Sequence, residues 1–225
     1  KMKKNKTKRK KRLRVGRLLF LVVIILLICF LFIRFVDVPI RSIIIKGNNI
    51  LTDQEVIEQA NLEDYQSYFS TFSFSVKNKL LKNPYVKSAK VSKGLLSIKI
   101  TIEEEKILYI DKASGNKVTE DKTIKDDKIV CAPYLTNEVP ENKLKKFKKA
   151  MGKIDDDILC QISEVMYDPN DIDADRYYLY MNDGNSVYLT VNKFSKINKY
   201  NTILENVGKQ NGTLYLYYGD YFEVK

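Results

Sequence analysis

The chain has 225 residues, and it contains no His and no Trp. Without His, Ser-His-Asp and Cys-His nucleophile systems and imidazole metal sites are excluded. The formal net charge is +11, but eleven of the Lys and Arg residues lie within residues 1–17, and the remaining 28 balance the 28 acidic residues. This distribution argues against a nucleic-acid-binding protein, because such a protein needs a basic face on a folded domain.

The first predicted element is a transmembrane helix at residues 18–36, with the sequence LLFLVVIILLICFLFIRFV. Sixteen residues, from Leu18 to Ile33, follow one another without a charge. Each apolar side chain lowers the free energy of insertion into the membrane by about 0.3 to 0.6 kcal/mol. Together they outweigh a cost of about 3 kcal/mol for inserting Arg34. The run is longer than a signal-peptide core and no A-x-A-like cleavage site follows it. A membrane anchor is therefore favoured over a cleaved secretory signal.

The flanking charges predict the orientation of this helix. Residues 1–17 carry basic residues and no acidic residue, and positively charged segments stay on the cytoplasmic side of a membrane. We therefore expect residues 1–17 to form a basic cytoplasmic tail that also contacts anionic lipid. Everything from residue 37 onward is then extracytoplasmic, in a single-pass type II protein of the cell membrane.

The first part of the extracytoplasmic region predicts one strand and two helices. A strand at residues 40–46 is followed by a helix that begins at a capping box made by Thr52 and Glu55. A second helix is expected to start with Ser75 as its N-cap and to stop at Asn83-Pro84. Its apolar side is predicted to consist of two pairs, Val76 with Leu80 and Phe74 with Leu81.

Two strands with alternating apolar residues are predicted next. They cover residues 85–92 and 96–102, and a turn at Lys93-Gly94 is expected to join them into a hairpin. Strict alternation indicates that one face of this hairpin is buried. The predicted order of elements is therefore βααββ.

This order, and the residues that carry it, resemble the POTRA domain of the cell-division protein FtsQ, called DivIB in Gram-positive bacteria. A strand leads into a turn at Gly47-Asn48, and Leu51-Thr52 stands directly before a helix. Two short motifs that end in Val follow at Asn83–Val86 and Ala89–Val91, and the alternating strand ends at Glu103. The resemblance implies a POTRA domain at residues 37–105, directly after the anchor.

The remainder of the chain resembles the β-domain of the same family more loosely, and we assign it to residues 106–218, with residues 219–225 as a C-terminal tail. Helices are predicted at residues 141–154 and 194–207. Strands are predicted at residues 107–110, 129–135, 162–167, 177–182 and 186–191. Asp183-Gly184 is a strong hairpin signal between the last two. The predicted fold class is a transmembrane helix followed by an α+β region, with the POTRA domain first and a β-rich domain second.

The last predicted strand, at residues 212–218, is the candidate partner-binding site. A terminal strand is often a sheet edge, and an exposed edge offers unpaired N–H and C=O groups to another chain. The alternative is that its tyrosines pack within their own sheet. The resemblance implies that this strand holds a partner of the FtsB or DivIC type. The candidate partner-binding residues are Thr213, Leu214, Tyr215, Leu216, Tyr217 and Tyr218.

Three Cys residues are present, and Cys29 lies in the predicted anchor. Cys131 and Cys160 lie in a compartment that permits disulfides. Two cysteines do not make a disulfide framework, so buried free thiols are favoured over a bridge between them, and a zinc site is disfavoured.

Acidic clusters do not predict a metal site or an enzyme. The D-x-D-x-D triplet at residues 171–175 begins like a calcium loop, but Arg176 stands where that loop needs Gly and Asn182 where it needs Glu. The carboxylate runs at residues 103–105 and 155–157 are consecutive, so their members cannot flank a sugar from opposite sides. We expect no catalytic residues, no metal and no cofactor.

The predicted function is a non-catalytic scaffold of the bacterial division machinery. The resemblance implies that its partners are FtsL-like and DivIC- or FtsB-like single-pass proteins and the septal peptidoglycan synthase complex, with no nucleic acid bound. Two alternatives remain open: an envelope protein that binds or modifies peptidoglycan, and a POTRA module for transport or assembly. The predicted location is the cell membrane at the division septum.

Overall fold

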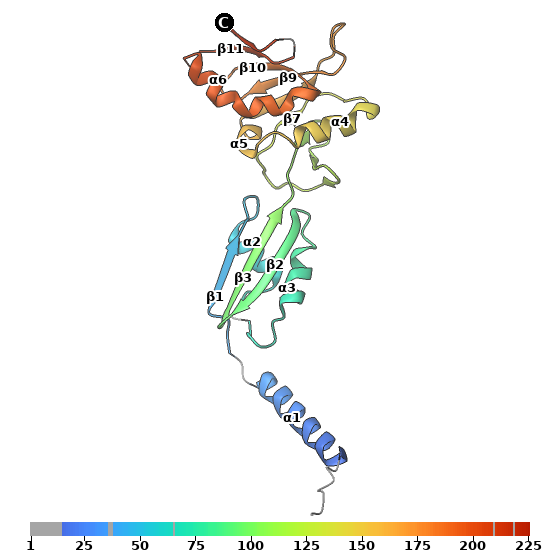
Figure 1. Ribbon diagram of the computed structural model, residues 1–225, viewed down its shortest axis with the longest axis vertical. Coiled ribbons are helices and arrows are strands. Elements are labelled where there is room, and N and C mark those ends of the chain that lie inside the picture. Colours follow the sequence, from blue (N-terminus) through green and yellow to red (C-terminus); the bar gives the residue numbers. More distant parts are fainter. Residues whose placement is uncertain (1–14, 36–37, 65, 209, 218) are drawn as a thin grey trace, which may run out of the picture. The chain divides into compact units, whose positions relative to one another are not determined.

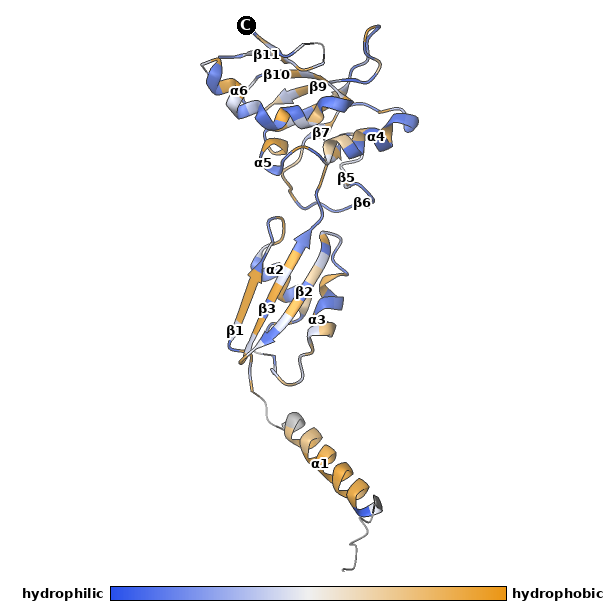
Figure 2. Ribbon diagram, in the orientation of Figure 1, coloured by the Kyte–Doolittle hydropathy of each residue, from blue (hydrophilic) through white to orange (hydrophobic). Residues whose placement is uncertain are grey.

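The computed structural model describes residues 15–35, 38–64, 66–208, 210–217 and 219–225 (Figure 1). Residues 1–14 of the predicted tail and residues 36–37 lie outside this part. Helix α1 (Val15–Phe35) has exposed apolar side chains from Leu18 to Phe32 and is largely orange in Figure 2. Within the described part of the chain, no helix is both long enough and apolar enough to cross a membrane. The predicted span at residues 18–36 stays a prediction.

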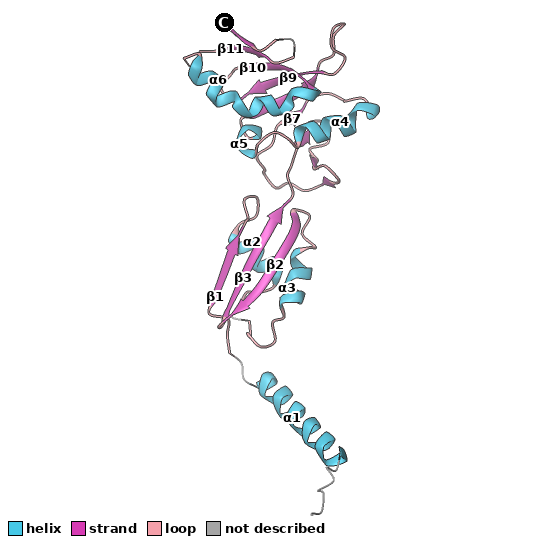
Figure 3. Ribbon diagram, viewed as in Figure 1, coloured by secondary structure: helices cyan, strands magenta, loops and turns pink. Residues whose placement is uncertain are grey.

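The chain divides into two compact units, Lys1–Glu103 and Glu104–Lys225. After α1, the first unit contains five elements, which Figure 3 colours as helices or strands. They are β1 (Ser42–Lys46), α2 (Asp53–Ala60), α3 (Ser73–Leu80), β2 (Val86–Gly94) and β3 (Ser97–Glu104). The strands form a sheet of order β1-β3-β2, in which β1 runs parallel to β3. The predicted βααββ order is confirmed.

Local signals explain most of this unit. The capping box at α2 is present: the Thr52 side chain accepts from the Glu55 N–H, and the Glu55 carboxylate accepts from the Thr52 N–H. Alternation along β3 buries every second residue, and α2 and α3 both lie on one side of the sheet (Figure 1). The shared core contains Val56, Ala60, Val76, Leu80, Ile98, Ile100 and Ile102.

Three predictions in this unit were wrong in detail. Helix α3 begins at Ser73 with Phe72 as its N-cap, not at Ser75, and both Phe74 and Leu81 are exposed rather than packed. The β2–β3 turn lies at Leu95 and Leu96 instead of Lys93-Gly94. Contacts from distant residues fix it there, because the Tyr68 hydroxyl donates to Gly94 O and the Arg41 N–H donates to Leu96 O.

The second unit is built on a nine-stranded sheet of order β12-β11-β10-β9-β8-β7-β4-β5-β6. Its strands are β4 (Tyr109–Asp111), β5 (Lys117–Val118), β6 (Thr123–Ile124), β7 (Tyr134–Leu135), β8 (Ile162–Tyr167), β9 (Arg176–Met181), β10 (Ser186–Thr190), β11 (Gly212–Tyr215) and β12 (Tyr221–Val224). Its helices are α4 (Glu141–Met151), α5 (Asp156–Leu159), the 3-10 helix η1 (Val191–Lys199) and α6 (Tyr200–Asn206).

Aromatic rings hold α4 and η1 against one face of this sheet. Phe147 of α4 stacks on Tyr177 of β9 with ring centroids 4.8 Å apart, and Phe194 of η1 meets Tyr177 edge-on at 5.3 Å. All three side chains are fully buried. The second unit therefore has its own aromatic core, and among the residues that the structure describes no helix covers the opposite face of the sheet (Figure 1).

The end of the chain differs from the prediction. Residues 219–225 were expected to be a tail, but Tyr221–Val224 form β12, which pairs antiparallel with β11. The side chain of Phe222 packs on the core and so holds this short strand to the sheet. Strand β11 ends at Tyr215 rather than at residue 218. Of the strand predicted at residues 129–135, only Tyr134 and Leu135 are extended.

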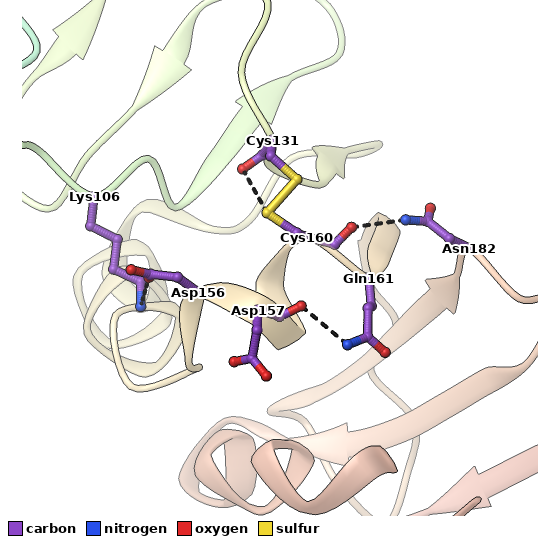
Figure 4. The surroundings of a disulfide bond; sticks show 7 residues. All are labelled: Lys106, Cys131, Asp156, Asp157, Cys160, Gln161 and Asn182. Carbon is purple, nitrogen blue, oxygen red and sulfur yellow. Dashed lines mark hydrogen bonds and ion pairs between the residues drawn. A yellow bond between two sulfur atoms is a disulfide. The ribbon is translucent and has the colours of Figure 1, made fainter. Parts of the chain in front are cut away.

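Cys131 and Cys160 form a disulfide, with their Cα atoms 5.2 Å apart, so the preference for free thiols was wrong (Figure 4). Cys160 is held at the end of α5, and its carbonyl oxygen accepts from the Asn182 side chain. Cys131 belongs to a segment without regular structure before β7. The fold brings the two together across 29 positions, and no local pattern in the sequence reports such proximity.

Candidate strand-addition edge

The large sheet has β12 at one edge and β6 at the other, and the C-terminal edge is β12, not the strand that the sequence indicated. β11 lies between β10, to which it is parallel, and β12, to which it is antiparallel. Strand addition needs backbone groups that no neighbouring strand already uses. The candidate edge is therefore Tyr221–Val224, one strand beyond the predicted residues.

The backbone of β12 alternates between its neighbour and the outer side. The Lys225 N–H donates to Asn211 O at 3.0 Å, so Lys225 faces β11. Because residues of an antiparallel strand take turns in bonding to one neighbour, Phe222 and Val224 direct their N–H and C=O groups away from β11. Val224 is 52% exposed. This side of the sheet can accept one further strand.

Glycine allows β12 to lie close to β11. A Cβ atom added at Gly212 would come within 2.1 Å of Glu223 O and 2.7 Å of the Phe222 ring. The Gly212 N–H donates to Asn185 Oδ1 at 2.7 Å, and the buried Asn185 amide also donates to the Tyr200 hydroxyl and to Asp183. This buried polar network fixes where β11 begins, and hence where β12 lies.

A row of four tyrosines crosses the outer face of the sheet and ends at the edge. The register pairs Tyr178 with Tyr188, Tyr188 with Tyr215, and Tyr215 with Tyr221. Successive ring centroids are 4.8, 5.5 and 4.6 Å apart. We call these residues the tyrosine row. Tyr221, at its end, is 52% exposed, so the row reaches solvent where a further strand would pair.

Polar contacts hold the row in one conformation. The Tyr215 hydroxyl donates to Glu223 at 3.0 Å, and this bond, helped by burial, raises the pKa of Tyr215 to about 12. The Arg176 guanidinium lies 4.8 Å from the centre of the Tyr188 ring and pairs with Asp168 at 2.6 Å. Burial raises the pKa of Tyr188. These contacts hold the two middle rings of the row in place, and the raised pKa values keep the hydroxyls of Tyr188 and Tyr215 neutral.

The structure separates the predicted partner-binding residues into two groups. Leu214 and Leu216 are buried in the core, and the Leu216 N–H already donates to Tyr188 O at 2.7 Å. Thr213, Tyr215 and Tyr217 are partly buried, and β11 uses its backbone on both sides. The sixth, Tyr218, lies outside the described residues.

Sequence reasoning missed β12 and most of the tyrosine row. The pairing of Tyr178 with Tyr188 was accessible, because the Asp183-Gly184 turn sets the register of the hairpin. The pairing of Tyr188 with Tyr215 was not, since it depends on a parallel contact made after a helical connection.

The acidic segment at residues 168–175 is used for structure. Asp175 pairs with Lys143 and Lys146 at 2.9 and 2.7 Å, and these bonds, Lys146 first, lower the pKa of its carboxyl. The Asp173 carboxylate accepts the Asp175 N–H and so shapes the turn. Among the residues that the structure describes, no group of three or more Cys, Asp or Glu residues could hold a metal ion.

Comparison with known proteins finds relatives among the cell division proteins. Residues 38–105 match the family described as POTRA domain, FtsQ-type. The chain is 30% identical over 192 residues to the cell division protein DivIB of Listeria monocytogenes, covering 81% of this chain and 71% of that protein. It is 27% identical over 233 residues to DivIB of Bacillus subtilis, covering 97% and 88%.

A solved structure also matches part of the chain. It is the major extracytoplasmic domain of the trans isomer of DivIB from Geobacillus stearothermophilus, with a TM-score of 0.37 and 22% identity. The match covers 45% of this chain and 90% of that domain.

Proposed function

Because the chain belongs to the DivIB family of cell division proteins, we propose that it is a non-catalytic scaffold that captures partner proteins on edge β12 at the septum. The observation that carries this proposal is the outer side of β12, where Phe222 and Val224 present backbone groups beside the exposed ring of Tyr221. Main-chain bonds would supply affinity and the tyrosine row specificity.

The partners we propose are FtsL-like and DivIC- or FtsB-like single-pass proteins, through which the scaffold would meet the septal peptidoglycan synthase complex. A partner strand on β12 would place one of its side chains next to Tyr221 as the fifth member of the tyrosine row. Aromatic and β-branched residues make the most favourable cross-strand pairs with tyrosine. We therefore expect such a residue in the partner segment.

We further propose that residues 18–36 anchor the scaffold in the cell membrane, with the basic tail in the cytoplasm and both units outside. The uncharged run from Leu18 to Ile33 and the basic residues before it support this topology. An anchor would keep the binding edge in the compartment where single-pass partners expose their own extracytoplasmic segments.

The test is a single substitution on the outer side of the edge. Val224→Pro in the full chain removes an outward N–H but no bond to β11, and proline is tolerated at such edge positions. We expect capture of small single-pass division proteins from dividing cells to fall about tenfold or more. Val224→Thr keeps the N–H and the branched shape, and it should bind normally. Equal capture by both variants would rule out strand addition at β12.

Binding to peptidoglycan is a second candidate function, favoured by the tyrosine row, in which Tyr221 is 52% exposed and the other three rings are partly exposed, because such rings could stack on sugar rings. It predicts that the protein sediments with purified peptidoglycan, that Val224→Pro sediments equally well, and that Tyr221→Ala does not. Release of soluble wall fragments would instead indicate an enzyme.

A further inference from the structure

Three large apolar side chains are exposed at one end of the first unit. Phe72 is 67% exposed, Phe74 is 74% exposed, and Leu95, in the β2–β3 turn, is 95% exposed. Phe72 and Phe74 stand at the start of α3, and none of the three contributes to the core. We call Phe72, Phe74 and Leu95 the apolar tip.

Hydrogen bonds tie together the two segments that carry the apolar tip. The Tyr68 hydroxyl donates to Gly94 O at 2.6 Å, next to Leu95. The Lys93 ammonium donates to Thr71 O at 2.9 Å, next to Phe72, and it lies 3.9 Å from the centre of the Tyr68 ring. The turn and the start of α3 are therefore neighbours.

The chain that leaves α1 enters the unit at this same end. The Tyr68 N–H donates to Val38 O at 2.8 Å, Pro39 forms a bridge with Ser67, and the Arg41 N–H donates to Leu96 O at 2.8 Å. Val38 is three residues after Phe35, the last residue of α1. Three residues span at most about 11 Å, so the end of α1 is never far from the segments that carry the apolar tip.

We propose that the apolar tip inserts into the interfacial region of the bilayer in which α1 is anchored. This inference rests on the proposed anchor. The covalent connection to α1 indicates that the apolar tip contacts a bilayer, because a bilayer holding α1 lies within reach of Phe72, Phe74 and Leu95. Phe and Leu side chains enter the boundary between headgroups and acyl chains to a depth of about 5 to 10 Å.

The driving force that we propose is the burial of apolar surface, because all three members of the apolar tip are uncharged. Arg41 and Lys93 lie beside the turn, but the insertion of Phe72, Phe74 and Leu95 does not depend on their charge. Insertion should take place in bilayers of neutral phosphatidylcholine as well as in anionic bilayers.

The lack of Trp allows a direct test. In full chains reconstituted into phosphatidylcholine bilayers, Leu95→Trp should give blue-shifted emission that is quenched by lipid brominated near the top of the acyl chains and less by lipid brominated near the methyl end. Ile129→Trp is the matched control, because Ile129 is also 95% exposed but belongs to the second unit. Its emission should be red-shifted and unquenched.

A third probe separates this proposal from the anchor on which it rests. Leu26→Trp, in the middle of α1, should be quenched most strongly by lipid brominated near the methyl end. If Leu26→Trp is quenched and Leu95→Trp is not, the anchor stands and the insertion of the apolar tip is refuted. Blue-shifted but unquenched emission from Leu95→Trp would also refute it, because it would mean that a second copy or another protein covers the apolar tip. If Leu26→Trp is itself unquenched, both proposals fail.

Discussion

The two sheets of this chain follow the same alternation but expose different chemistry on their outer faces. In the POTRA sheet, the residues that alternate with the buried isoleucines of β3 are Ser97, Lys99 and Thr101, which suit contact with water. In the large sheet, the equivalent positions of β9 and β10 include Tyr178, Tyr180 and Tyr188, and the rings of Tyr178 and Tyr188 lie side by side in register. Alternation alone predicts which face is buried. The residue type on the other face indicates whether that face is only solvated or also suited to binding.

The two units also differ in what supports them. The POTRA unit contains a capping box and an alternating strand that can be recognised locally, although the parallel pairing of β1 with β3 joins distant segments. In the large sheet, β4, β7 and β11 are each placed by a parallel pairing with a distant segment. The following predictions test this difference.

The largest effect is expected from removing the aromatic core of the second unit. Phe147→Ala should lower the free energy of unfolding of that unit by about 3 to 5 kcal/mol, because Phe147 stacks on Tyr177 and contacts Phe194. Denaturant unfolding of the full chain should show one transition shifted and the POTRA transition unchanged. Ile129→Ala, at a position in the same unit that is 95% exposed, is the control. A shift of both transitions by Phe147→Ala would show that the units are not independent.

Gly212→Ala should separate β12 from the sheet, because the added Cβ would meet Glu223 O. We expect a loss of about 2 to 3 kcal/mol, the scale of overpacking. Hydrogen exchange should accelerate at residues 221–225 while β9 and β10 remain protected. Gly152→Ala, where the new atom meets only ordinary contacts at 3.6 Å, should change neither.

The outer faces themselves can be compared by truncating one residue on each. Tyr188→Ala should destabilise the second unit by about 1.5 kcal/mol, because the Tyr188 ring packs against Tyr178 and Tyr215. Thr101→Ala, on the exposed face of β3, should change the free energy of unfolding of the POTRA unit by less than about 0.5 kcal/mol. Equal effects would mean that the tyrosine row adds no packing energy.

The smallest effect concerns the ion pairs of Asp175 and depends on pH. Because Lys146 and Lys143 lower the pKa of Asp175 in the folded chain, the stabilisation is complete above the ordinary Asp pKa of about 3.9 and is lost as pH falls through the lower folded value. Asp175→Asn should cost about 1 kcal/mol at pH 7. Urea titrations of this variant and the parent chain should converge as the pH is lowered below 3.9. If the difference in the free energy of unfolding between the two chains does not change with pH, the charge of Asp175 is not its cause.

The sequence predicted the POTRA fold well because its signals are local. The capping box at Thr52 and the alternation from Ile98 to Ile102 each specify an element without help from distant residues. The β2–β3 turn was misplaced since Tyr68 and Arg41, which fix it, are remote in sequence.

The candidate site was predicted one strand short for the same reason. Residues 221–224 are too few to show periodicity, and only the docking of Phe222 on the core and the close approach at Gly212 make them a strand. The disulfide and the parallel pairing of β10 with β11 likewise join segments that are distant in sequence, and no sequence pattern indicates that these segments lie close together.

The Asn185 network has a consequence for the order in which the molecule acquires its function. Contacts between residues close in sequence form early in folding, because distant segments must first lose loop entropy. The β9–β10 hairpin joins residues close in sequence, so we expect it to form early. In contrast, β11 docks through a hydrogen bond from Gly212 to Asn185, 27 positions apart, and β12 can pair only once β11 is in place. The β12 edge, where we propose that partners bind, therefore exists only in chains whose second unit has completed folding. We expect immature or damaged copies of the chain not to bind these partners.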